Sequence, residues 1–188
     1  MDRREVKKGR AMIKSVLVRN YRGIRNCRLE NLKRVNVFIG RNNSGKSSLL
    51  ESLYLASAAF YLREELSKKV TNKIDYLLNR RCYRGYNWNN AKEVLWYEYD
   101  VESPIFIELS MESKQDATKV IRISLFDWHP HPVVKHQFGD HDYICFIHKY
   151  PVNSQKKLEI SDISPTGEIQ KYDEVRTFFS NFKFIGST

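Results

Sequence analysis

The chain is poor in cysteine and has no apolar run long enough to cross a membrane. Its three cysteines, Cys27, Cys82 and Cys145, are scattered and form no Cys-x-x-Cys pair. An odd number of dispersed thiols argues against a secreted disulfide framework and fits a reducing compartment. Residues 1–10 are charged and lack the apolar centre of a signal peptide. We therefore expect a cytoplasmic protein without a membrane partner.

Acidic residues are scarce relative to basic ones. The chain has 22 Asp and Glu against 32 Lys and Arg, which gives a net charge of +10. This excess indicates a polyanionic partner such as DNA, although a solvated basic surface is the simpler alternative. Part of the excess lies in residues 1–11, which we expect to form a basic arm.

The most informative stretch is residues 40–48, which contain the pattern G-x-x-x-x-G-K-[ST] of a phosphate-binding loop. Gly40 and Gly45 allow the tight turn that points backbone N–H groups at phosphates. Lys46, the candidate catalytic residue, reaches the β- and γ-phosphate oxygens, and the Ser47 hydroxyl suits Mg²⁺. The predicted ATP and Mg²⁺ site comprises Gly40, Arg41, Asn42, Asn43, Ser44, Gly45, Lys46, Ser47 and Ser48.

The sequence on either side supports this interpretation. Residues 35–39 form a short apolar run rich in β-branched side chains, typical of a buried strand. Residues 48–60 contain strong helix formers, and Leu49, Leu50 and Leu53 recur at helical spacing. A strand, a glycine loop and a helix in this order are what phosphate binding requires.

Alternating patterns elsewhere predict a mixed α and β fold. Residues 12–18 and 24–29 flank a turn and predict an antiparallel hairpin. Further strands are predicted at 104–111, 119–125, 143–148, 157–160 and 182–186. We therefore expect an α/β fold in which the helix after the loop covers a sheet containing antiparallel strands.

Two other segments each allow two interpretations. Residues 80–90 interleave three arginines with Tyr83, Tyr86 and Trp88. Such a mixture can stack on bases and neutralise phosphates, although aromatic side chains more often serve packing. Residues 127–142 hold four of the five histidines. Their spacing matches no zinc pattern, so we favour a polar loop over a metal site.

The corner Asn20-Tyr21-Arg22-Gly23, which follows an apolar strand and precedes the phosphate-binding loop, resembles the N-terminal segment of ABC-type ATPase heads. The RecF, Rad50, SMC and OLD-family proteins are the nearest group, and the resemblance is specific over residues 12–60. It implies a lobe with a mixed sheet and places Arg22 beside the nucleotide phosphates. It also implies that ATP binding closes a homodimer of heads, in DNA repair, chromosome maintenance or defence.

Two motifs needed for ATP hydrolysis are missing. Hydrolysis needs an acidic residue on an apolar strand and a group that positions the attacking water. The pair Asp173-Glu174 follows residues 169–172, which are not an apolar strand, and no Ser-Gly-Gly signature occurs. We therefore expect residues 1–188 to be one incomplete ATPase domain whose turnover needs a C-terminal half. A non-catalytic, nucleotide-responsive module with a protein partner stays open as the alternative.

Within this domain we predict four parts. They are the basic arm 1–11, the hairpin, loop strand and helix of 12–60, a charged and aromatic insertion at 61–103, and a strand-rich part at 104–188.

Overall fold

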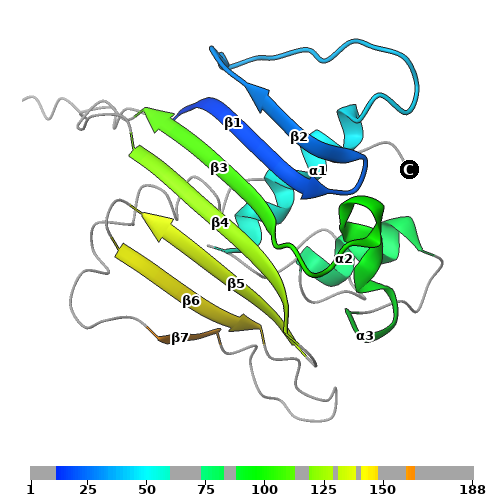
Figure 1. The fold of residues 1–188 in the computed structure, drawn as a ribbon. Coiled ribbons are helices and arrows are strands. Elements are labelled where there is room, and N and C mark those ends of the chain that lie inside the picture. Colours follow the sequence, from blue (N-terminus) through cyan, green and yellow to red (C-terminus); the bar gives the residue numbers. More distant parts are fainter. Residues whose placement is uncertain are drawn as a thin grey trace, which may run out of the picture.

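One antiparallel sheet organises the protein, and its seven strands follow the order β2-β1-β3-β4-β5-β6-β7 (Figure 1). The computed structural model describes residues 12–59, 73–82, 88–112, 119–128, 131–138, 141–147 and 160–163. The strands are β1 Met12–Tyr21, β2 Ile24–Leu29, β3 Ile105–Glu112, β4 Lys119–Trp128, β5 His131–Phe138, β6 His141–Ile147 and β7 Ile160–Ile163. Every described pairing is antiparallel.

The N-terminal hairpin forms as predicted, with β1 and β2 antiparallel. Tyr21 pairs with Ile24 across the turn, and Val18 pairs with Ile107 on the other side of β1. Buried and partly buried residues alternate along β3, because one face of this strand lies on the core. The predicted combination of helices, an antiparallel hairpin and further antiparallel strands is confirmed.

Helices gather against one face of the sheet (Figure 1). They are α1 Lys46–Ala58, α2 Lys73–Arg81, α3 Trp88–Ala91 and the 3₁₀ turns η1 Lys92–Leu95 and η2 Tyr97–Tyr99. None of the helices in the described part of the chain is long and apolar enough to span a membrane.

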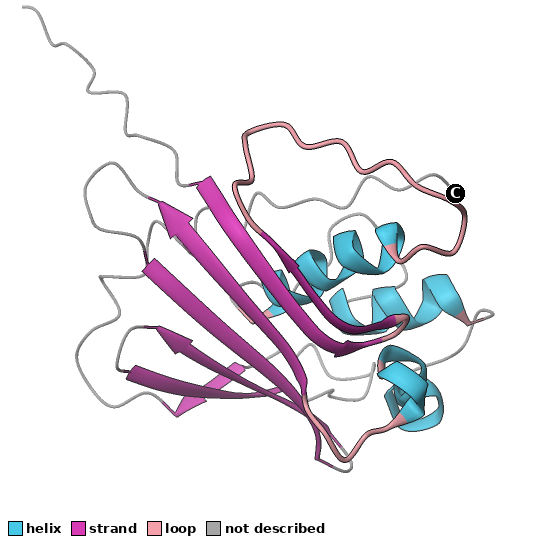
Figure 2. Ribbon diagram, turned by 45° about the horizontal axis from the view of Figure 1, so that its top comes forward, coloured by secondary structure: helices cyan, strands magenta, loops and turns pink. Residues whose placement is uncertain are grey.

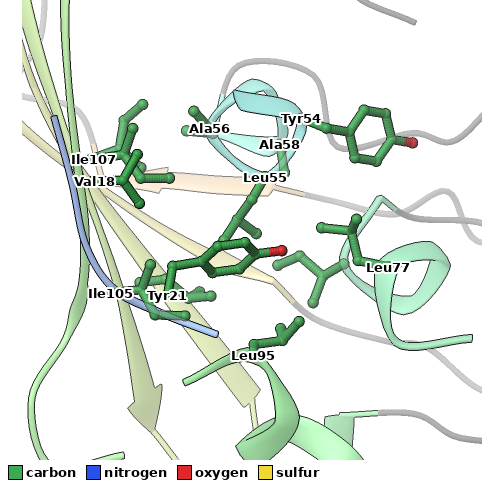
Figure 3. Packing of buried hydrophobic residues seen from close by; sticks show 14 of the residues in the cluster. Val18, Tyr21, Tyr54, Leu55, Ala56, Ala58, Leu77, Leu95, Ile105 and Ile107 are labelled. Carbon is green, nitrogen blue, oxygen red and sulfur yellow. The ribbon is translucent and has the colours of Figure 1, made fainter. Parts of the chain in front are cut away.

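The core forms where α1 and α2 meet the sheet. Figure 3 shows Val18 and Ile107 from the strands facing Leu55 of α1 and Leu77 of α2. Tyr21 lies among these side chains and is fully buried. Because α1 is buried along most of its length, its position relative to the sheet is set by packing on several sides.

The histidine-rich segment differs from the prediction. Residues 131–138 form β5, not a polar loop, and pair with β4 and β6. Pro132 stands near the start of the strand, where a missing N–H group is tolerated. The local sequence did not indicate this strand. Its polar residues show no strand pattern, because backbone pairing with other strands stabilises it and not local periodicity. Within the part of the chain that the structure describes, no group of His, Cys, Asp and Glu could hold a metal.

The segment before the phosphate-binding loop also differs. Residues 35–39, predicted as a buried strand, belong to no strand and begin with a bend at Val35. Val35, Val37 and Ile39 are 81%, 77% and 91% exposed, whereas Phe38 packs against the core. In the described structure no neighbouring strand supplies hydrogen bonds to this segment. Figure 2 shows this stretch within the long loop between β2 and α1.

Several predicted features lie outside the described residues. They are the basic arm 1–11, residues 61–72 and 83–87 of the predicted insertion, residues 157–159 of one predicted strand, and the strand at 182–186.

Two leucines of α1 provide a test of this core. Leu55 is 3% exposed and packs between the helices and the sheet, whereas Leu50 is 41% exposed. Leu55→Ala should lower the free energy of unfolding by about 2–5 kcal/mol, since it removes buried contacts and leaves a cavity. Leu50→Ala, the same change on the same helix, should cost less than about half as much. Urea unfolding of both variants measures the difference, and equal losses would contradict the described packing.

Candidate functional site

The loop at the start of α1 has the tight geometry that phosphate binding requires. Gly45 adopts a left-handed conformation with φ of 84° and directly precedes Lys46, the first residue of the helix. Glycine reaches this conformation without the strain imposed by a side chain. A Cβ atom on Gly40 would lie 3.0 Å from Ser44 Oγ, so the loop closes tightly at that point. Both glycines of the motif therefore stand where the backbone needs them.

The side chain of Lys46 spans this loop. Its Nζ donates to the carbonyl oxygens of Gly40 and Arg41 at 2.8 and 2.5 Å, and to Ser44 Oγ at 3.1 Å. The first N–H groups of a helix have no partner within the helix, and Gly45 supplies no side-chain cap here. A cationic amine and a helix N-terminus thus meet in one loop, an arrangement that favours anions.

A cavity of about 670 Å³ opens in front of this loop. Its volume falls within the roughly 300–1,000 Å³ of small-molecule sites. Gly40 and Arg41, which were also predicted for the site, contribute carbonyl oxygens that accept from Lys46 and are not among the lining residues. The described lining residues are Arg22, Gly23, Asn42, Asn43, Ser44, Gly45, Lys46, Ser47, Ser48, Arg81, Cys82, Val94, Trp96, Glu98 and Tyr99.

The corner between β1 and β2 brings Arg22 to this cavity. Asn20 and Arg22 both have positive φ values, 55° and 52°. The amide of Asn20 donates to the backbone oxygen of Ser103 at 2.6 Å, and the N–H of Arg22 donates to Leu95 O at 3.0 Å. A non-glycine residue keeps such a conformation only where its surroundings enforce it, which is common at functional sites.

Glu51 of α1 lies at the centre of a charged cluster beside the cavity. Its side chain is 1% exposed, and it accepts hydrogen bonds from Arg22 and from Arg81 at the end of α2. Arg22 therefore lines the predicted site while bound to a carboxylate. Burial raises the pKa of the neighbouring Tyr21 phenol, and the charge of Glu51 raises it further. Tyr21 consequently stays protonated next to the cluster.

Trp88, considered above as a possible DNA contact, has a packing role. It is 5% exposed and packs edge-on against Trp96, with ring centroids 5.8 Å apart. The indole of Trp96 in turn donates to Ser103 O at 2.8 Å. The DNA interpretation is therefore wrong for Trp88, while Tyr83 and Tyr86 lie outside the described residues.

Sequence reasoning missed Glu51 and the segment 94–99 as parts of the site. A signal for Glu51 was available, since a charged residue on a helix that is apolar on most sides must find a partner when buried. Segment 94–99 had no such signal. This segment reaches the cavity because the backbone of Trp96 pairs with that of Tyr21, at the end of β1, in an isolated antiparallel bridge.

Comparison with known families agrees with this geometry. The profile of the AAA ATPase domain matches residues 12–184. The chain belongs to this family. The expected kinship with RecF-type P-loop ATPases is confirmed by partial matches to RecF proteins.

Individual relatives match part of the chain. An ATP/GTP phosphatase of Helicobacter pylori is 29% identical over 104 residues, which are 55% of this chain and 26% of that protein. The DNA replication and repair protein RecF of Alkaliphilus oremlandii is 37% identical over 106 residues, which are 56% of this chain and 26% of that protein. The chain thus spans about a quarter of the length of these two relatives. No solved structure matches it.

Proposed function

We propose that this chain is the ATP-binding N-terminal part of a RecF-like ATPase. The observation that carries the proposal is the Lys46 ammonium held across a glycine loop at the start of α1, facing a cavity of nucleotide size. Triphosphate oxygens are the same kind of acceptor as the carbonyl and hydroxyl oxygens that Lys46 now contacts. The oxygens of a bound triphosphate can therefore replace these acceptors, and the Lys46 amine would still donate hydrogen bonds to oxygen atoms.

The residues of the loop carry the chemical groups that bind Mg²⁺-ATP. Backbone N–H groups around Gly45 and the first turn of α1 would hold the phosphates, and Lys46 would neutralise the β- and γ-phosphate oxygens. The Ser47 hydroxyl, which is exposed at the start of the helix, is a hard oxygen donor of the type that Mg²⁺ prefers. The metal would spread the charge of the phosphates during transfer.

Hydrolysis needs groups that we do not assign to this chain. Among the described residues that line the cavity, Glu98 is the one carboxylate. It stands in η2 with a φ of 51°, not on an apolar strand that could hold Mg²⁺ through water. We propose that the water-positioning residues belong to another part of the full-length protein, and that ATP closes two heads into a dimer.

We further propose that the full-length protein acts on DNA in the cytoplasm. The net charge of +10 supports a polyanionic partner, and the RecF relatives are named as DNA replication and repair proteins. The alternative is a nucleotide-responsive module that binds another protein and does not turn over. The missing hydrolysis motifs favour this second candidate, whereas the basic charge favours the first.

Lys46 tests nucleotide binding. Lys46→Ala removes a charge-assisted contact worth about 1.5–3 kcal/mol, so MgATP should bind about ten- to a hundred-fold more weakly. Lys33→Ala, which removes an exposed lysine from the same loop, serves as the control and should bind as the parent does. Calorimetric titration measures all three proteins. Equal affinity in Lys46→Ala and the parent would refute the proposed role of the loop.

Turnover tests the incomplete site. The chain of 188 residues should hydrolyse ATP far more slowly than the common enzymatic range of about 1 s⁻¹ or more. Steady-state phosphate release measures this rate, with Lys46→Ala as the background. A rate in the common range that is lost in both Lys46→Ala and Glu98→Gln would place a catalytic carboxylate within this chain.

Salt dependence tests the DNA proposal. Labelled duplex DNA should bind this chain at 50 mM salt and lose about ten-fold or more in affinity at 200 mM, because binding releases counterions from the phosphates. Fluorescence anisotropy follows the titration. Failure to bind at 50 mM salt would favour the protein-partner alternative.

A further inference from the structure

Glu51 is a buried carboxylate on the helix that begins with the phosphate-binding lysine. Its side chain is 1% exposed, so water contributes little to its stability. Burying a charge in this way is costly unless other charges and hydrogen-bond donors compensate for it. The identity and position of its partners therefore decide what this residue does.

Two guanidinium groups from different elements contact this carboxylate. Nη1 of Arg22, in the turn after β1, donates to Oε2 at 2.7 Å. Nε of Arg81, the last residue of α2, donates to Oε2 at 3.3 Å, and its Nη2 contacts Oε1. Arg81 thus binds both carboxylate oxygens, a geometry that fixes the plane of its guanidinium group.

The cluster carries more positive charge than Glu51 needs. One arginine neutralises one carboxylate, so the second leaves a surplus of one positive charge. The side chains of Arg22 and Arg81 are 21% and 33% exposed, and both line the cavity in front of the phosphate-binding loop. Each guanidinium has five N–H donors, and the contacts with Glu51 use only some of them. Donors and net positive charge therefore border the space proposed for the phosphates.

We propose that Arg81 is a further phosphate-binding residue, and that Glu51 is the positioning residue that holds Arg22 and Arg81 at the cavity. This inference rests on the nucleotide binding proposed above and assigns two residues to it that the loop motif does not contain. Glu51 touches no ligand in this role. It keeps two flexible side chains in one orientation, which lowers the entropy lost when phosphate binds.

The test compares neighbouring arginines of α2. Arg81→Ala should weaken MgATP binding by about ten-fold, since a charge-assisted contact is lost. Arg80→Ala is the matched control, because the Arg80 guanidinium lies over the Tyr76 ring, with Cζ 5.9 Å from its centroid, and does not line the cavity. It should bind MgATP as the parent does. Calorimetry at one salt concentration measures both variants, and thermal unfolding checks that both remain folded.

Inorganic tripolyphosphate separates a phosphate contact from a structural effect. This probe lacks base and sugar, so Arg81→Ala should weaken it by a factor similar to that for ATP. Arg81→Lys keeps the charge but loses the planar fork, and should give an intermediate affinity. A loss confined to ATP would overturn the phosphate contact, because the affected group would then be the base or the ribose.

Glu51→Gln tests the positioning role. Removing the carboxylate charge leaves two arginines side by side, so they should separate and MgATP should bind at least as weakly as in Arg81→Ala. Tighter binding would overturn the proposal, because the carboxylate would then compete with phosphate for the arginines. If Glu51→Gln does not fold, Arg81→Ala and Arg81→Lys still test the phosphate contact.

The outcomes distinguish this inference from the proposed function. If neither the parent nor any variant binds MgATP, nucleotide binding itself fails. If the parent binds and Lys46→Ala does not, but Arg81→Ala matches Arg80→Ala, only the inference on Arg81 and Glu51 is overturned.

Discussion

The packing of α1 against the sheet is the constraint on which the rest of this structure depends. The helix contacts β1, β3 and α2, and most of its residues beyond the first turn are buried. A helix enclosed in this way cannot tilt or slide without opening cavities in the core. Its N-terminus and the loop before it are therefore held in one place, as an anion site that depends on backbone N–H groups requires.

The packing of α1 against the sheet also buries a charged side chain, that of Glu51. Glu51 points from α1 toward the end of the first hairpin and the end of α2, where Arg22 and Arg81 meet it. The ion cluster thus joins three elements that are far apart in the sequence. Truncating one partner of a buried ion pair is strongly destabilising, so this cluster also favours one arrangement of the hairpin and both helices.

The corner at the end of β1 shows how the fold supports the site from outside the loop. Asn20 and Arg22 hold left-handed conformations because residues 95–103 accept their hydrogen bonds. Trp96 of that segment packs against Trp88, and both side chains are excluded from solvent. Trp88, which resembled a nucleic-acid contact in the sequence, thereby supports the segment that holds Arg22 at the cavity.

The sequence by itself determined the parts that depend on local chemistry. The spacing of Gly40, Gly45 and Lys46 predicted the loop, because tight turns and helix starts are set by nearby residues. The alternation of apolar and polar residues predicted the hairpin and β3, because this pattern also depends only on nearby residues. Only the tertiary structure decided that β5 is a strand, that residues 35–39 are not, and that Glu51 joins Arg22 to Arg81. Strand pairing and buried ion contacts involve residues that are distant in the chain, and no local pattern records which of them meet.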